Sequence, residues 1–438
     1  MERALMQAPI LDSVMTRLAY TDVKALVATC PYIRSMLQHP YFNAIFMAYM
    51  YEWLLGWLRE EYPSESRKLC IDTLRTITML RLVDRDIVLP YELCYLTTLR
   101  ELYVERAGEI PMMLFELRNL HILCWRRSAL TSVPHDINRL SHLIVLKLRD
   151  GALTSLPDEL FDLTALQELD VSGNQLTTIS TRISALKHLR VLCVNTNRLT
   201  VIPSEIEALT FLEELDVHTN RITVIPQCVC DLRLLNCLDV HRNEIIRIPD
   251  AIGDLRALTH LNVHCNRIAV LPVSMGKLRN LTHLDVHQNE LESLPNALCD
   301  LRLLESINLN KNGLSALPIG IDRLINLRFF RCSSNHITHI PIELCRITSL
   351  CTLHMKHNAL TDIPTAVGDL INLRSLNLRN NHISTIPSSV IGVSNLLSLN
   401  LSRNMISIVP SEVWQMVRLF RVDLSHNRIS TIRQSQTK

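Results

Sequence analysis

The sequence predicts an α/β solenoid, in which short strand-turn-helix units stack with a parallel sheet on the inner, concave face. Three observations support this prediction. An asparagine recurs every 23 residues from Asn174 to Asn427, a proline column runs from Pro90 to Pro410 with one interruption at Ser180, and alternating leucines precede each asparagine. A period this strict indicates about sixteen stacked repeats instead of separate globular domains.

Each column of the repeat has a physical role. The leucines ahead of the asparagine alternate with period two, which predicts a short strand with its leucines facing inward. The asparagine turns the chain, and its side chain can satisfy backbone groups that the turn leaves unpaired. Proline fixes φ and ends the strand. The IxxLxxL segment that follows has helical spacing and places an apolar stripe against the strands.

The full pattern, LxxLxLxxNxLxxIPxxIxxLxxL, is identified as the leucine-rich repeat, and it covers roughly residues 74–433. The 23-residue form with "IP" after the asparagine turn resembles the intracellular Ras-group leucine-rich repeat proteins. This resemblance implies a scaffold that binds protein partners along its concave face. We therefore predict a solenoid over residues 71–438 and a helical N-terminal module over residues 1–70.

Histidines recur on the predicted concave face. The stretch LDVHTN at residues 215–220 returns as LDVHRN, LNVHCN and LDVHQN, and each histidine occupies the seventh position of LxxLxLxxN. The third, fifth and seventh positions point out of the sheet, where side chains are free to contact a partner. The candidate partner-binding residues are Asp216, His218, Asp239, His241, His260, His264, His283, Asp285, His287, Arg331, His354, Lys356 and Arg379.

Three interpretations of the histidines compete. Neighbouring strands lie about 4.8 Å apart, so two imidazoles and a carboxylate could hold zinc, or the histidines could form a pH-sensitive contact. We favour a plain protein-binding surface without a metal, because duplication of a repeat also copies its surface residues. The concave face is acidic at its centre and basic in its C-terminal third, which favours an elongated protein partner of complementary charge.

The composition argues against other functions. The sequence lacks GxGxxG, GxxxxGK[ST], HExxH and GxSxG, so we expect neither an enzyme nor a cofactor. The net charge of +2 and basic stretches without interleaved aromatics argue against nucleic acid. Thirteen scattered cysteines and a start without signal-peptide features predict a cytoplasmic, reduced, monomeric protein. Cys230, Cys299 and Cys345 share one column and are expected to be buried thiols.

The N-terminal segment differs from the repeats. Residues 10–37 contain two stretches with helical apolar spacing, and the start Pro9-Ile10-Leu11, the late Cys30 and the sequence Arg34-Ser35-Met36-Leu37 resemble the F-box. That module binds the adaptor of cullin-type ubiquitin ligases. A plain helical cap for the first repeat is the alternative. If the segment is an F-box, the resemblance implies that the adaptor-binding residues are Ile10, Leu11, Val14, Leu18 and Leu26.

Residues 41–62 are rich in aromatic side chains. An apolar segment up to Leu58 is long enough to suggest a membrane span, but it has many tyrosines and no flanking basic cluster. We expect this segment to pack over the first repeats instead, with Trp53 and Trp57 as its anchors.

Overall fold

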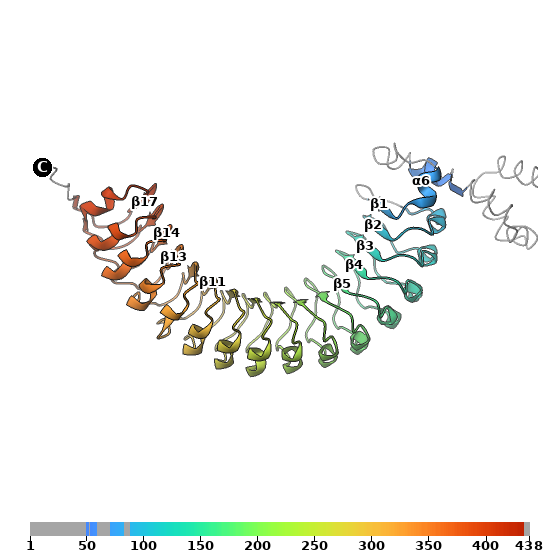
Figure 1. Ribbon diagram of the computed structural model, residues 1–438, viewed down its shortest axis with the longest axis horizontal. Coiled ribbons are helices and arrows are strands. Elements are labelled where there is room, and N and C mark those ends of the chain that lie inside the picture. The colour runs from blue at the N-terminus through green and yellow to red at the C-terminus, as the bar shows by residue number, and fades with distance from the viewer. Residues whose placement is uncertain (1–49, 52, 59–70, 83–87, 433–438) are drawn as a thin grey trace, which may run out of the picture. The chain divides into compact units, whose positions relative to one another are not determined.

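The computed structural model describes residues 50–51, 53–58, 71–82 and 88–432 of the chain (Figure 1). The predicted adaptor-binding residues, from Ile10 to Leu26, lie outside these residues. The chain forms two compact units, residues 1–168 and residues 169–438, and each is described here by itself.

Within the described residues, sixteen strands, one from each repeat, follow one another in sequence order and confirm the predicted parallel arrangement. In the first unit, parallel pairs join β1 (Met79–Leu82), β2 (Glu101–Glu105), β3 (Ile122–Arg126) and β4 (Val145–Arg149). Strand β5 (Glu168–Asp170) begins at the end of that unit. In the second unit the strands are β6 (Val191–Cys193), β7 (Glu214–Asp216), β8 (Cys237–Asp239), β9 (His260–Asn262), β10 (His283–Asp285), β11 (Ser306–Asn308), β12 (Phe329–Arg331), β13 (Thr352–His354), β14 (Ser375–Asn377), β15 (Ser398–Asn400) and β17 (Arg421–Asp423). A further short pair, β16 (Ile408–Val409) with β18 (Thr431–Ile432), lies at the last repeats.

The helical segments of the repeats are 3₁₀ helices, most of them five residues long. They are η1 (Tyr91–Tyr95), η2 (Met112–Glu116), η3 (His135–Arg139), η4 (Asp158–Asp162), η5 (Thr181–Ala185), η6 (Ser204–Ala208), η7 (Gln227–Asp231), η8 (Asp250–Asp254), η9 (Val273–Lys277), η10 (Asn296–Asp300), η11 (Ile321–Arg323), η12 (Ile342–Arg346), η13 (Thr365–Asp369), η14 (Ser388–Gly392) and η15 (Ser411–Gln415). Five residues are too few for a stable α-helix, and the i→i+3 bonds of a 3₁₀ helix suit such short segments. The one α-helix with described bounds, α6 (Ile71–Thr76), precedes the repeats.

The proline column sets where these 3₁₀ helices begin. Pro203 stands directly before η6 with φ −66° and ψ 147°, and prolines elsewhere in the column have closely similar angles. Ser180, the interruption in the column, has φ −60°, and its hydroxyl accepts a bond from the Arg182 amide. Gly320 precedes the shorter η11 and has a left-handed φ of 86°.

The core lies between the strands and the 3₁₀ helices. In the second unit the strands line the inner side of the curve and the 3₁₀ helices its outer side (Figure 1). Leu215 and Val217 from the β7 region and Ile206 from η6 are fully buried. The strands from β6 to β15 all show the same alternation, with a buried central residue between two exposed or half-buried ones. The inward orientation of the strand leucines is confirmed.

The asparagine column forms a ladder of bonds between repeats. The Asn243 amide nitrogen donates to the carbonyls of Val240 and Val217, at 3.0 and 3.1 Å, and its oxygen accepts from the Ile222 amide at 2.9 Å. One side chain therefore closes the turn of its own repeat and also binds the preceding repeat. The sequence predicted the first role but not the second.

A helical segment precedes the repeats in the first unit. Residues 50–51 and 53–58 are helical, and the Tyr51 hydroxyl donates to the carbonyl of Tyr95 in η1 at 3.1 Å. The predicted packing over the first repeats is thus confirmed, but the anchors are different. Trp53 and Trp57 are only half-buried, whereas Leu54 and Leu58 are almost fully buried. Within the described residues, no helix combines the length and the apolar character that crossing a membrane requires.

Candidate protein-binding face

The four seventh-position histidines form a continuous stack on the inner face of the second unit. Adjacent ring centres from His218 to His287 are 4.1, 4.2 and 4.2 Å apart, and the interplanar angles are 13–20°. The predicted ladder of neighbouring imidazoles is therefore present. His260 and His283, which occupy the third position of their repeats, form a separate pair with ring centres 4.5 Å apart.

Fifth-position side chains hold the rings of this ladder. The Asp239 and Asp285 carboxylates lie 2.6 and 2.7 Å from Nδ1 of His241 and His287. Because a carboxylate accepts but does not donate, the proton of each ring is on Nδ1. Nδ1 of His264 is bonded in the same way to the Asn262 oxygen, at 2.6 Å.

Burial and mutual repulsion keep part of the ladder uncharged. Burial, with the neighbouring rings of His241 and His287, lowers the pKa of His264 to about 4. Burial also lowers the pKa of His218 and raises that of Asp216. A proton added to a desolvated imidazole beside other stacked rings is unfavourable. The rings of His218 and His264 are therefore neutral at pH 7.

The basic residues predicted for the C-terminal third lie on the same face. Arg331 ends β12 beside His354, which ends β13, and Lys356 and Arg379 follow in the next column. Arg331, Lys356 and Arg379 form no ion pair with any residue that the structure describes. Nε of Arg379 is buried and lacks a hydrogen-bond partner among those residues. These positive charges therefore lie outside the ion pairs of the described residues, although Arg379 helps to lower the pKa of the nearby Asp423 carboxyl.

Sequence reasoning missed an aromatic side chain here. Phe329, at the third position of its repeat, is half-buried at the start of β12. The guanidinium carbons of Arg328 and Arg331 lie 5.9 and 5.7 Å from its ring centre, within cation–π range. The signal was available, because an aromatic at a third position must point out of the sheet. Aromatic and arginine side chains often dominate binding energy at protein interfaces.

A serine and a histidine also meet on this face. Nε2 of His354 lies 2.9 Å from the Ser375 hydroxyl. Burial and the charges of Arg331 and Lys356 lower the pKa of His354. Nucleophilic catalysis needs a base whose cationic form is stabilised, normally by a carboxylate. The surroundings of His354 oppose that form.

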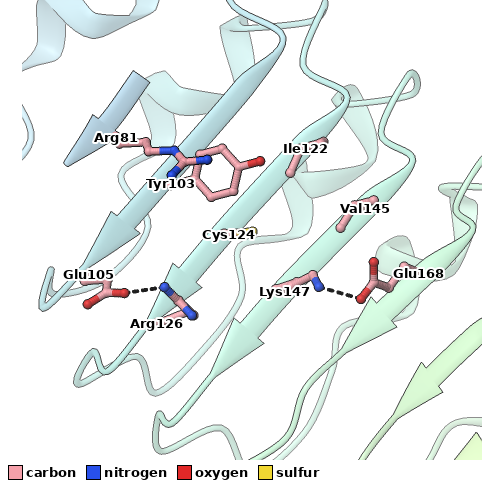
Figure 2. Close-up of a pocket in the computed structure, with 9 residues that line it drawn as sticks. All are labelled: Arg81, Tyr103, Glu105, Ile122, Cys124, Arg126, Val145, Lys147 and Glu168. Carbon is pink, nitrogen blue, oxygen red and sulfur yellow. Dashed lines mark hydrogen bonds and ion pairs between the residues drawn. The ribbon is translucent and has the colours of Figure 1, made fainter. Parts of the chain in front are cut away.

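The first unit has a hollow on the corresponding face, with a volume of about 540 Å³ (Figure 2). Its basic residues are largely compensated within the chain. Figure 2 shows Arg126 paired with Glu105, and Lys147 Nζ lies 2.5 Å from Glu168. The Arg81 guanidinium lies 4.7 Å from the ring centre of Tyr103. This hollow therefore presents little uncompensated charge to a partner.

The cysteine column is buried as expected. Cys230, Cys299 and Cys345 are at most 1% exposed, and burial raises their pKa values to about 12, 11 and 12. All cysteines within the described part of the chain are free thiols. The three buried thiols of this column are unreactive and serve as small apolar side chains.

Comparisons with known proteins agree with the fold. A profile described as "Leucine rich repeat" matches residues 116–182, 256–314 and 371–429, one described as "Leucine-rich repeat region" matches residues 177–270, and a two-copy profile matches residues 348–389. No similar sequence is found among curated proteins.

Several solved structures are similar to this chain. An LRR protein of Leptospira interrogans is 29% identical, with 83% of this chain and 94% of that one covered and a TM-score of 0.79. The plant peptide hormone receptor RGFR1, solved in complex with RGF2, is 26% identical over 78% of this chain, with a TM-score of 0.65. A TDR receptor is 26% identical over 82% of this chain, with a TM-score of 0.73. The chain spans 65% of each of these receptor chains.

The strand order, the asparagine ladder and the matches over residues 116–314 and 348–429 lead to one assignment. The chain belongs to the leucine-rich repeat proteins.

Proposed function

We propose that the inner face of the second unit binds a protein partner, and that the chain acts as a non-enzymatic interaction scaffold. The observation that carries this proposal is the group of three cations, Arg331, Lys356 and Arg379, which form no ion pair within the described residues and lie beside the half-buried ring of Phe329. An aromatic anchor next to unpaired cations favours an acidic segment with an apolar side chain.

The arrangement of the face supports an elongated partner. Three side-chain columns run across successive parallel strands, and their character changes from histidine and aspartate at β7–β10 to arginine and lysine at β12–β14. A partner that follows the columns meets different charges along its length, which fixes its register. The similar receptor RGFR1 is solved in complex with RGF2, so ligand binding occurs on this type of fold.

Charge reversal on the inner face tests the proposal. In cells of the source organism, the full chain carries a photo-crosslinking residue in place of Phe329, and the crosslinked partner is identified and purified. We expect Arg331→Glu with Arg379→Glu to weaken binding of that partner at least tenfold. Arg279→Glu with Arg302→Glu is the matched control, since both residues are exposed and lie outside the inner-face columns.

Two results contradict the proposal. In the first, the inner-face and control double variants bind the partner equally well. In the second, a crosslinker placed at the exposed Phe211, outside the inner-face columns, captures the same proteins as one at position 329. Either result would show that the partner does not bind at the inner face.

We further infer a cytoplasmic, monomeric protein of the 23-residue Ras-group type, with residues 1–70 as a separate module and 71–438 as the solenoid. The free thiols of the described residues support a reducing location.

The pattern of residues 9–37 favours a second function, that of an F-box substrate receptor in a cullin-type ubiquitin ligase. In that case, Leu11→Asp with Leu26→Asp in the full chain abolishes co-purification of the ligase adaptor while the inner-face partner is retained. If no adaptor co-purifies with the unaltered chain, residues 1–70 are a cap.

A further inference from the structure

Three possible metal ligands converge at one rung of the histidine ladder. A ligand atom from each of His264, Cys265 and His287 lies within 4.8 Å of the other two. The two rings stack with centres 4.2 Å apart, and the Cys265 amide donates to the His287 carbonyl at 2.9 Å. From this geometry we propose that His264, Cys265 and His287 bind one thiophilic transition-metal ion, with zinc as the first candidate.

The hydrogen bonds of the rings leave one nitrogen of each ring available for a metal ion. Asp285 accepts the Nδ1 proton of His287 at 2.7 Å. Asn262 presents its oxygen to Nδ1 of His264, because its nitrogen donates to Asp239 at 3.0 Å. In both rings Nε2 therefore keeps its lone pair. An oxygen acceptor on one ring nitrogen, with the other nitrogen free, is the arrangement that metal-binding histidines have in proteins.

The ligand set selects the kind of ion. Two imidazoles and one thiolate suit zinc and similar borderline or soft ions, whereas magnesium and calcium require oxygen ligands. The Cys265 thiol must release its proton to solvent as the metal–sulfur bond forms. Three protein ligands leave a fourth tetrahedral position for water or for a side chain of a partner.

The distances require a modest closure of the site. Bonds of about 2.0 Å to nitrogen and about 2.3 Å to sulfur separate the ligands of a tetrahedral ion by about 3.5 Å. The ligand atoms, now within 4.8 Å of one another, must therefore approach by roughly 1 Å. The two stacked rings, now 14° from parallel, must also tilt so that the in-plane lone pairs of both Nε2 atoms point at one ion. The three side chains are half-buried, and rotation about their side-chain bonds supplies both movements.

Only this rung of the ladder carries a sulfur. The residues that correspond to Cys265 after the other histidines are Thr219, Arg242 and Gln288. The arginine at that position opposes a cation at the His241 rung. The other rungs of the ladder, where imidazoles stack without a neighbouring thiol, therefore serve as internal controls.

Cobalt(II) titration of the purified, metal-free full chain tests the proposal. Tetrahedral cobalt with one thiolate ligand gives visible d–d bands and a near-ultraviolet charge-transfer band, and zinc then displaces the cobalt. We expect one cobalt per chain and release of about one proton on binding. Cys265→Ser should abolish the charge-transfer band, and His287→Gln and His264→Gln should each weaken cobalt binding at least tenfold.

The matched controls are His218→Gln, in the same ladder, and His283→Gln, in the other histidine pair. Both should bind cobalt as the unaltered chain does, and circular dichroism of every variant checks the fold. Absence of the charge-transfer band in the unaltered chain overturns the proposal, as does a Cys265→Ser variant that keeps the band. The measurement uses no partner, so its failure leaves the proposed protein binding unaffected.

Discussion

At the scale of the residue, the asparagine ladder is a continuous set of buried polar contacts. The residue before each asparagine is in the left-handed region, with φ of 52° at Thr219 and 51° at Arg242, although neither is a glycine. This conformation is unfavourable for a residue with a β-carbon. The bonds of the asparagine side chain to two repeats offset this strain, so the stability of each turn depends on one amide group.

Replacing Asn243 by alanine removes four hydrogen bonds at once. The buried Ile222 amide loses its acceptor, whereas the Val217 and Val240 carbonyls each keep one bond, from the side chains of Asn220 and Asn266. Each buried backbone group left unpaired costs about 1–3 kcal/mol. With one such group left unpaired, we expect Asn243→Ala to lower the free energy of unfolding by about 1–3 kcal/mol, measured by urea denaturation.

Amide hydrogen exchange shows whether this loss is local. The Ile222 amide should exchange faster in Asn243→Ala, because its acceptor has been removed. Asn280→Ala is the control, since Asn280 is exposed and donates to the Arg256 carbonyl at the surface. Equal destabilisation by the two substitutions would contradict the role assigned to the ladder.

One buried carboxyl in the first unit makes stability depend on pH. Glu92 in η1 is 1% exposed, and within the described residues neither of its side-chain oxygens has a hydrogen-bond partner. Burial raises its pKa to about 7, from an ordinary value of 4.5. The folded state therefore binds this proton more tightly than the unfolded chain does.

The sign of the pH effect follows from this shift. The contribution of Glu92 to stability is fully present below pH 4.5 and is lost as the pH rises through about 7. Each unit of pKa difference corresponds to about 1.4 kcal/mol. The quantity to compare is the free energy of unfolding of Glu92→Gln minus that of the unaltered chain. We expect this difference to be about 2–3 kcal/mol larger at pH 8 than at pH 5. Glu290→Gln, at an exposed site, should show no such difference between the two pH values.

At the scale of the element, close packing of neighbouring 3₁₀ helices requires small residues. A β-carbon added at Gly276 in η9 would lie 2.4 Å from the backbone oxygen of Ala297 in η10. That oxygen belongs to the backbone, so it cannot rotate away as a flexible side chain would. The two helices would have to separate.

We therefore expect Gly276→Ala to lower the free energy of unfolding by about 1–3 kcal/mol, the usual cost of overpacking. The intrinsic helix preference of alanine acts in the opposite direction, so a net loss would identify the steric contact as the cause. Gly108→Ala is the control, because a β-carbon there meets no atom within 4 Å. Thermal denaturation of both variants measures the difference, and a neutral Gly276→Ala would show that η9 and η10 separate without cost.

At the scale of the whole molecule, periodicity explains why most of the fold could be predicted. A 23-residue repeat fixes the strands, the turns and the buried columns together, because a shift in any column would expose leucines such as Leu215. The 3₁₀ form of the helical segments was not predictable from IxxLxxL alone. That spacing fits any helix, and the limited length between the proline and the next strand decides the form.

The candidate site was less predictable, for a related reason. The columns place the inner-face side chains, so the neighbouring positions of His218 and His241 could be expected. The convergence of Cys265 on His264 and His287 could not, because it depends on a left-handed residue just beyond the inner-face columns. The importance of Phe329 depends on its two flanking arginines, which periodicity does not encode.

A repeat architecture predicts that one whole period can be removed from the second unit. Deleting residues 290–312 removes η10 and β11 and joins Asn289 to Gly313, so every column stays in register and β10 pairs with β12. Because each repeat contacts only its neighbours, the shortened chain should fold with an unchanged type of circular dichroism spectrum and a lower urea midpoint.

Deleting only residues 290–301 keeps β11 but removes η10, so the chain cannot pass around the outer side before the next strand. We expect that variant to aggregate or to unfold in separate steps. If the two deletion variants behaved alike, the stability of this unit would not depend on keeping whole 23-residue repeats.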